Sequence, residues 1–173
     1  AVGDAVYGFI EFGGFADYAV VAESALAPMP RTLTFELAAA VPLAATTALQ
    51  GLRDAGRMKA GERVLVVGAS GGVGTFAVQL AKAFGAHVTA VTSGRNAALV
   101  RAIGADEVVD YTREDVTRGE RRFDVVLQLA GTAGASELRR ILAPGGRLVM
   151  SSGDSRGRVL GPFTRVIRGL LLN

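Results

Sequence analysis

Residues 63–96 read RVLVVGASGGVGTFAVQLAKAFGAHVTAVTSGRN, and this stretch decides the fold. It opens with an apolar run that does not alternate, as expected of a strand buried on both faces. Glycines follow at positions 68, 71, 72 and 74. Apolar residues then recur every three or four positions from Val73 to Phe84, which predicts one face of a helix that ends at Gly85. Residues 87–93, HVTAVTS, predict a second strand.

The same alternation continues to the end of the chain. Two more helices are predicted at residues 96–104 and 135–142, and three more strands at residues 107–111, 123–131 and 146–153. Strands that alternate with helices predict an α/β fold with a doubly wound parallel sheet over residues 61–173. Upstream, residues 4–10 and 13–24 predict short β segments, and residues 35–60 predict connecting helices that Pro42 divides into a short and a longer one.

Composition narrows the functional classes. The chain has 173 residues and a net charge of +3, with 17 arginines and two lysines that form no basic stripe among aromatics. We therefore expect no nucleic-acid partner. There is no cysteine and one histidine, His87, so we expect no metal site. No apolar run reaches the roughly 18 residues of a membrane span, so we expect no membrane partner. The chain lacks an initiator methionine, and we expect it to be part of a longer protein.

The glycine cluster lies between a buried strand and a strongly periodic helix, which favours a dinucleotide site. A pyrophosphate can rest there on bare backbone N–H groups at the helix N-terminus. Ala69-x-Gly71-x-x-Gly74 fits the dinucleotide fingerprint with alanine in the first glycine place. Gly68-x-x-x-Gly72-x-Gly74 fits the short-chain dehydrogenase spacing, but no Tyr-x-x-x-Lys pair accompanies it, and a methyltransferase would also place glycines here. We expect valine at Gly71 or Gly74 to abolish binding and leave the protein folded.

The end of the second predicted strand bears on the cofactor. NAD and S-adenosylmethionine sites usually hold a ribose hydroxyl with an acid about 20 residues past the loop. No acid occurs between Thr75 and Ala105. Ser93 offers a hydroxyl and Arg95 a planar cation, which suit a 2′-phosphate. The sequence therefore predicts NADP(H) in preference to NAD(H).

These motifs carry a family resemblance. Residues 61–91, 99–115, 123–131 and 142–149 resemble the zinc-free quinone oxidoreductase branch of the medium-chain dehydrogenase/reductase superfamily, and the upstream segments 3–8, 13–21 and 38–52 are similar to the same branch in the same order. The resemblance implies that residues 1–34 are the last part of a GroES-like substrate domain and residues 61–173 an incomplete Rossmann domain. Gln128 departs from the branch, which often has aspartate there.

The resemblance also implies roles for individual positions. Thr47 matches a threonine beside the nicotinamide, and Gly71, Gly72, Val73 and Gly74 match the pyrophosphate loop. Cofactor contacts are implied in addition at the 2′-phosphate by Ser93, Arg95 and Tyr111, and at the nicotinamide half by Gly131 and Ser152. No catalytic side chain is predicted within the chain. A plain helix hydroxyl is the alternative for Thr47, and a surface aromatic for Tyr111.

The activity that these features imply is transfer of hydride from NADPH to a quinone or an α,β-unsaturated carbonyl without zinc. The implied partner is a small electrophile, and the compartment the cytoplasm; a homodimer is left open for the full-length protein. One alternative is an enoyl reductase domain of a multidomain synthase. Another is a non-catalytic protein that binds NADPH and senses redox state.

Overall fold

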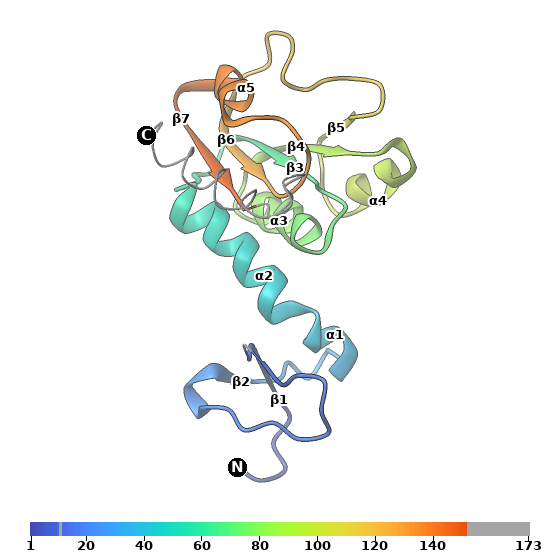
Figure 1. The fold of residues 1–173 in the computed structure, drawn as a ribbon, viewed down its shortest axis with the longest axis vertical. Coiled ribbons are helices and arrows are strands. Elements are labelled where there is room, and N and C mark those ends of the chain that lie inside the picture. Colours follow the sequence, from blue (N-terminus) through green and yellow to red (C-terminus); the bar gives the residue numbers. More distant parts are fainter. Residues whose placement is uncertain (11, 152–173) are drawn as a thin grey trace, which may run out of the picture. The chain divides into compact units, whose positions relative to one another are not determined.

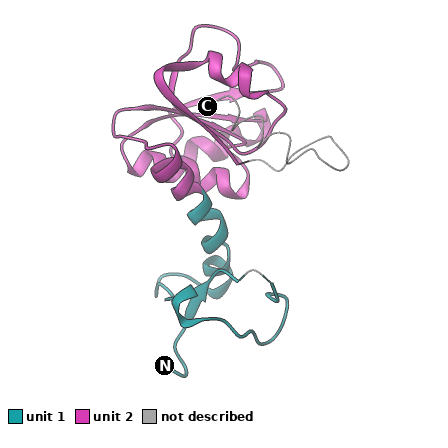
Figure 2. Cartoon of the chain, turned by 60° about the vertical axis from the view of Figure 1, so that its left-hand side comes forward, with its two compact units in different colours: residues 1–47 teal, residues 48–173 magenta. Residues whose placement is uncertain are grey.

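The computed structural model describes residues 1–10 and 12–151. The chain divides into two compact units, Ala1–Thr47 and Ala48–Asn173, which Figure 2 colours separately. Each unit is described by itself below. Residues 152–173 lie outside the described part of the chain. They include Ser152 and the end of the strand predicted at 146–153.

The first unit contains little regular β structure. Strand β1 (Val6–Gly8) pairs antiparallel with β2 (Leu26–Pro28), which follows the short helix η1 (Glu23–Ala25). The strand predicted at residues 13–24 is wrong, because residues 12–22 adopt no helix or strand. Alternating apolar residues become a strand only when a neighbour supplies hydrogen bonds, and this segment has no paired strand among the described residues. Phe12, Phe15 and Tyr18 are instead exposed.

The predicted break between two helices is confirmed. Helix α1 (Phe35–Ala39) begins after Thr34, whose hydroxyl accepts a hydrogen bond from the Leu37 N–H at 3.4 Å. Helix α2 (Val41–Gln50) carries Pro42 in its first turn, where a missing N–H costs nothing. The π-helical segment η2 (Gly51–Ala55) continues it.

The second unit is built on a five-stranded parallel sheet, as predicted (Figure 1). Its strands are β3 (Arg63–Val67), β4 (His87–Thr92), β5 (Glu107–Asp110), β6 (Phe123–Gln128) and β7 (Leu142–Met150). Its helices are α3 (Gly72–Ala83), η3 (Gly94–Asn96), α4 (Ala97–Ala102) and α5 (Ala135–Arg140). The strand order is β5-β4-β3-β6-β7, so the strand order reverses between β3 and β6. This arrangement is a doubly wound Rossmann sheet.

Alternate residues of β3 enter two separate cores. Val64 and Val66 pack with α3, α4 and Leu52 of η2, whereas Leu65 and Val67 pack with Leu138 of α5. Both faces of the sheet are therefore covered, which explains why the strand sequence shows no polar alternation. The helix ends also match the prediction, since Gly85 and Gly104 have φ of 83° and 111°.

The start of the last strand differs from the expectation. Strand β7 begins at Leu142 instead of residue 146, and its register against β6 shifts between Phe123 and Val125. Gly145, with φ of 75°, lies inside this irregular start, so the Pro-Gly-Gly segment that precedes the predicted strand is part of the observed one. The assignment of residues 1–34 to a GroES-like domain stays a prediction.

Candidate functional site at the carboxyl edge of the sheet

The glycine loop lies where β3 ends and α3 begins. The N–H groups of Gly68 and Ala69 both donate to the carbonyl of Val91 at 3.1 Å, so the loop bends toward the end of β4. Gly71 then precedes α3 and has no side chain to cap it. The first N–H groups of a helix have no partner within the helix, so this end can accept an anion.

The glycines of this loop serve different purposes. A Cβ on Gly74 would lie 2.2 Å from the Gly68 oxygen, and a Cβ on Gly68 would lie 2.8 Å from the Ala130 Cβ. These two glycines permit close packing of the chain on itself. A Cβ on Gly72 would meet no atom within 4 Å, and one on Gly71 would meet only the Gly68 oxygen at 3.4 Å. The expectation that the fold tolerates valine at Gly74 conflicts with this geometry, because backbone fills the space that the added Cβ would need.

A dinucleotide fits this geometry at Gly71 and Gly72. Both residues are exposed, and the space beside Gly72 is one that a Cβ would fill. Val73 turns its side chain toward the core formed by α3 and β3, so it could serve a ligand only through its backbone. The loop thus presents bare backbone toward open space and packs the remainder of its surface inward.

A polar network joins the glycine loop to the end of β4. The Ser70 Oγ accepts hydrogen bonds from the Thr92 hydroxyl at 2.7 Å and from the Asn96 Nδ2 at 3.0 Å. Asn96 Nδ2 also lies 3.4 Å from the Ser93 Oγ. Ser70, Thr92 and Asn96 were not among the predicted site residues, although all three lie near the carboxyl end of a predicted strand. Ser93 is therefore held at this edge by a defined network.

Two residues predicted for the 2′-phosphate are accessible. Arg95 lies in η3, is exposed and makes no side-chain hydrogen bond or ion pair with another described residue. Tyr111 directly follows β5; its N–H donates to the Thr92 carbonyl at 3.1 Å, and it is 64% exposed. Arg95 thus follows the carboxyl end of β4, two residues after Ser93, and Tyr111 follows the carboxyl end of β5.

An acidic side chain that was not among the predicted site residues, Asp110, reaches the loop after β4. Asp110 ends β5, and its carboxylate lies so near Gly94 that a Cβ there would be 2.5 Å from the Oδ2. Its Oδ1 accepts from the Thr112 N–H at 3.0 Å and the Thr112 hydroxyl at 2.8 Å. Hydrogen bonds from the Thr112 backbone and hydroxyl lower the pKa of Asp110, because they favour the ionised carboxylate. No acid follows β4 in sequence, but one approaches from β5.

The loop after β6 forms the neighbouring wall. Leu129 N–H donates to the Val67 carbonyl at 3.0 Å, and Ala130 packs on Gly68. Gly131 is exposed with φ of 92°, a conformation that favours glycine. It lies beside Val67 at the edge where it was predicted, since a Cβ there would be 3.7 Å from that side chain. The other residue predicted for this wall, Ser152, lies outside the described residues.

Thr47 belongs to the first unit. Its hydroxyl donates to the Leu43 carbonyl of the same helix at 2.7 Å, which is the plain helix role weighed above. The hydroxyl oxygen keeps its acceptor capacity. A role beside the nicotinamide stays a prediction.

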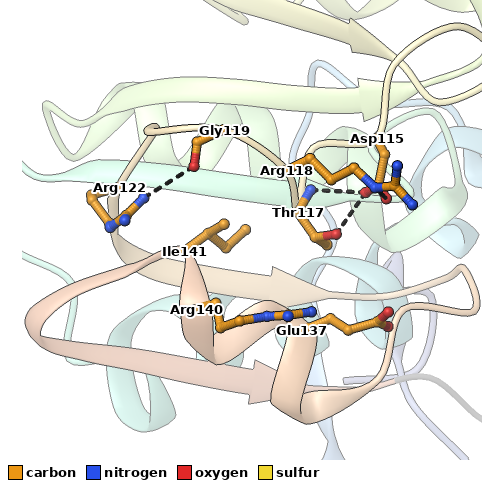
Figure 3. A pocket seen from close by; sticks show the side chains of 8 residues that line it. All are labelled: Asp115, Thr117, Arg118, Gly119, Arg122, Glu137, Arg140 and Ile141. Carbon is orange, nitrogen blue, oxygen red and sulfur yellow. Dashed lines mark hydrogen bonds and ion pairs between the residues drawn. The ribbon is translucent and has the colours of Figure 1, made fainter.

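Two cavities lie away from the glycine loop. One of 460 Å³ lies between α5 and the segment 115–122 that connects β5 to β6 (Figure 3). Two of its three arginines are already engaged: Arg118 pairs with Asp115 at 3.1 Å, and Arg122 donates to the Gly119 carbonyl at 3.4 Å. The other, of 570 Å³, lies beside η3 and α4 and includes Gly94 and Asp110. It borders the predicted 2′-phosphate region.

The described residues contain no group of three or more histidine, aspartate or glutamate side chains placed to hold a metal ion. No helix within the same ranges is both long enough and apolar enough to cross a membrane.

Comparison with known proteins places the chain in a family. Residues 72–170 match the model of the zinc-binding dehydrogenases. A 2-methylene-furan-3-one reductase of Solanum lycopersicum is 39% identical over 162 residues, which cover 87% of this chain and 41% of that protein. The spectinabilin polyketide synthase system protein NorB of Streptomyces orinoci is 43% identical over 155 residues, or 86% of this chain and 7% of that protein.

A solved structure agrees with both sequence matches. The quinone oxidoreductase of Thermus thermophilus, whose complex with NADPH is also known, superposes with a TM-score of 0.74 at 38% identity over 82% of this chain and 48% of that one. The present chain thus spans about half or less of the relatives that it matches. The chain belongs to the zinc-binding dehydrogenase family, in the quinone oxidoreductase branch of the medium-chain dehydrogenase/reductase superfamily of oxidoreductases.

Proposed function

We propose that this chain provides the NADP(H)-binding part of a zinc-independent reductase of quinones or α,β-unsaturated carbonyls. The observation that carries the proposal is the pair Gly71 and Gly72, whose backbone faces open space at the start of α3, at the edge where the strand order reverses. Ligands of open α/β sheets bind at this edge. The names of the relatives support the substrate class, because they include a furanone reductase and a quinone oxidoreductase.

The roles divide between two neighbouring segments of the edge. Gly71, Gly72 and Val73 would hold the pyrophosphate through backbone N–H groups, while Gly74 lets α3 approach closely enough to point at it. Arg95 would pair with the 2′-phosphate, with Ser93 and Tyr111 beside it. Asp110 works against this preference, so Arg95 has to outweigh its charge.

At the nicotinamide half, Gly131 with Thr47 and Ser152 would border the ring. When bound, the cofactor supplies the hydride. The task of the chain is then to fix the position of the ring and to exclude water, for which Val67 and Ala130 provide apolar surface. The absence of cysteine from the sequence favours a substrate that is already electrophilic and needs no zinc to polarise it. Solvent would then protonate the product oxygen.

An enoyl reductase domain of a multidomain synthase is the second candidate. The match to a polyketide synthase protein supports it, since that match covers as much of this chain as the match to the furanone reductase does. The two candidates share the cofactor and differ in the substrate. The first predicts reduction of a free quinone, and the second predicts reduction of a crotonyl thioester. Binding of NADPH with no turnover of either would favour the non-catalytic alternative.

Cofactor titration tests the proposal. We expect NADPH to bind the protein at least ~10-fold more tightly than NADH, which corresponds to ~1.4 kcal/mol. Arg95→Ala should remove most of this preference and leave NADH binding unchanged, because only the 2′-phosphate needs the guanidinium. Arg118→Ala is the matched control, because it removes an exposed arginine of the segment between β5 and β6 that has no proposed contact with the cofactor, and it should change neither affinity. Equal affinities for both cofactors in the unmodified protein would contradict the assignment of NADP(H).

A further inference from the structure

Gln128 is a buried polar residue beside the proposed cofactor site. It ends β6 between Val67 of β3 and Met150 of β7, and it is fully buried. Its Nε2 donates to the carbonyl of Ala133 at 3.0 Å. Its Oε1 is buried as well and has no hydrogen-bond partner among the described residues.

This arrangement is difficult to explain by stability. A buried amide oxygen without a donor costs more free energy than one neutral hydrogen bond contributes, so an apolar side chain of the same length would suit the core at least as well. The orientation of the amide follows from its surroundings, because the reverse orientation would set two oxygens against each other and leave the amide N–H groups unpaired. What the amide provides is the bond to Ala133.

Ala133 lies in the loop of residues 129–134, which packs on the glycine loop. Leu129 anchors the beginning of this loop on Val67, and the Gly134 N–H donates to the Glu137 carboxylate at 2.6 Å at the start of α5. Between these anchors, Ala130 comes so near Gly68 that a Cβ added to Gly68 would clash with the Ala130 Cβ. The position of this loop therefore limits the space beside the glycine turn.

We propose that Gln128 is a positioning residue: through the Ala133 carbonyl it holds loop 129–134 against the glycine loop. By holding this loop, Gln128 also shapes the wall of the cofactor site; this second part of the proposal rests on the proposed function. The holding of the loop itself does not depend on any ligand, and the two parts can be tested separately.

The first variant is Gln128→Met, which keeps length and apolar packing and removes the amide. We expect resistance to urea equal to or above that of the unmodified protein, together with roughly 10-fold faster hydrogen exchange of the amides of residues 129–134. NADPH should bind roughly 10-fold more weakly. Gln79→Met is the matched control, because the Gln79 Nε2 also donates to a carbonyl at 3.0 Å, that of Thr75, on the exposed surface of α3. It should alter none of these measurements.

The second variant, Gln128→Glu, separates positioning from mere filling of the core. When ionised, the new carboxylate would face the Ala133 carbonyl and repel it; when protonated, its O–H can donate as the amide does. Its strand neighbours Val67 and Met150 are apolar, so burial should raise its pKa into a range that can be reached without unfolding. We expect fast exchange of loop 129–134 at high pH and a return to the rate of the unmodified protein, compared at each pH, as pH falls.

The outcomes are distinct. Unchanged exchange of the loop in Gln128→Met, or exchange in Gln128→Glu that differs from that of the unmodified protein by the same factor at every pH, would overturn the proposal. A large loss of stability in both variants would also overturn it, because Gln128 would then be a stability residue. If the loop responds as expected but no variant, nor the unmodified protein, binds NADPH, the proposed cofactor is wrong and the positioning role stands.

Discussion

Replacing Gly74 by alanine should lower the stability of the fold, whereas replacing Gly72 by alanine should not. The added Cβ at Gly74 would lie 2.2 Å from the Gly68 oxygen and 2.8 Å from two backbone atoms of Ala69. Real carbon contacts of this kind are not shorter than 3.0 Å, so the start of α3 must move by about 0.8 Å. The buried Ala77 and Val78 on the same helix oppose that movement.

The magnitude follows from two opposed effects. Overpacking costs about 1–3 kcal/mol, and here the upper end applies because backbone atoms cannot rotate away. Alanine regains about 1 kcal/mol of helix propensity over glycine. We therefore expect Gly74→Ala to lower the free energy of unfolding by about 2 kcal/mol. At Gly72 nothing lies within 4 Å and φ is not positive, so Gly72→Ala should be neutral or stabilise by about 0.5 kcal/mol.

Urea denaturation and NADPH titration of both variants provide the test. Gly72→Ala should bind NADPH about 10-fold more weakly while it stays fully folded, because its Cβ enters the space proposed for the pyrophosphate. A Gly74→Ala protein as stable as the unmodified one would refute the close-packing reasoning. Undiminished binding by folded Gly72→Ala would show that the ligand lies elsewhere.

Three further predictions concern charged residues. Arg147 donates to both oxygens of Glu62 at 3.0 and 2.7 Å and to the Gly56 carbonyl at 2.7 Å, so Arg147→Met should destabilise by about 2–3 kcal/mol at pH 7 in urea unfolding. Hydrogen bonding to Arg147 lowers the pKa of Glu62, so the stability from this pair is present above about pH 4.3 and is lost as pH falls further. The difference in unfolding free energy between Arg147→Met and the unmodified protein should therefore narrow below that pH. Burial raises the pKa of Asp106, but hydrogen bonds from the Lys82 ammonium and the Val88 N–H lower it more. Asp106→Asn should therefore reduce the free energy of unfolding by about 1 kcal/mol at pH 7, and by progressively less below about pH 4, in the same assay. Asp110→Asn should strengthen NADPH binding about threefold without affecting NADH, because it removes a negative charge beside Gly94; unchanged NADPH affinity would place the 2′-phosphate away from β5.

Much of the second unit could be predicted from sequence order alone. An apolar run without alternation, a glycine loop and a helix of regular period recur as local patterns, and each pattern reports a single buried face. Strand and helix positions from Arg63 to Arg140 followed from them. The same patterns predict a ligand at the carboxyl edge of the sheet, and that stays a prediction. The first unit was less predictable: an alternating segment such as 13–24 needs a paired strand, and pairing is not a local property.

What only the tertiary structure decided is how residues far apart in sequence share one space. The sequence shows four glycines within seven positions. The fold shows that Gly74 faces backbone and Gly68 faces Ala130, whereas Gly72 faces open space. The sequence shows no acid after β4, but parallel pairing brings Asp110 of β5 to Gly94. In the sequence, Gln128 is only a polar residue at the end of a largely apolar strand; packing buries it and leaves its Oε1 without a donor among the described residues. Local periodicity determines which elements form, and three-dimensional packing determines which atoms they bring together.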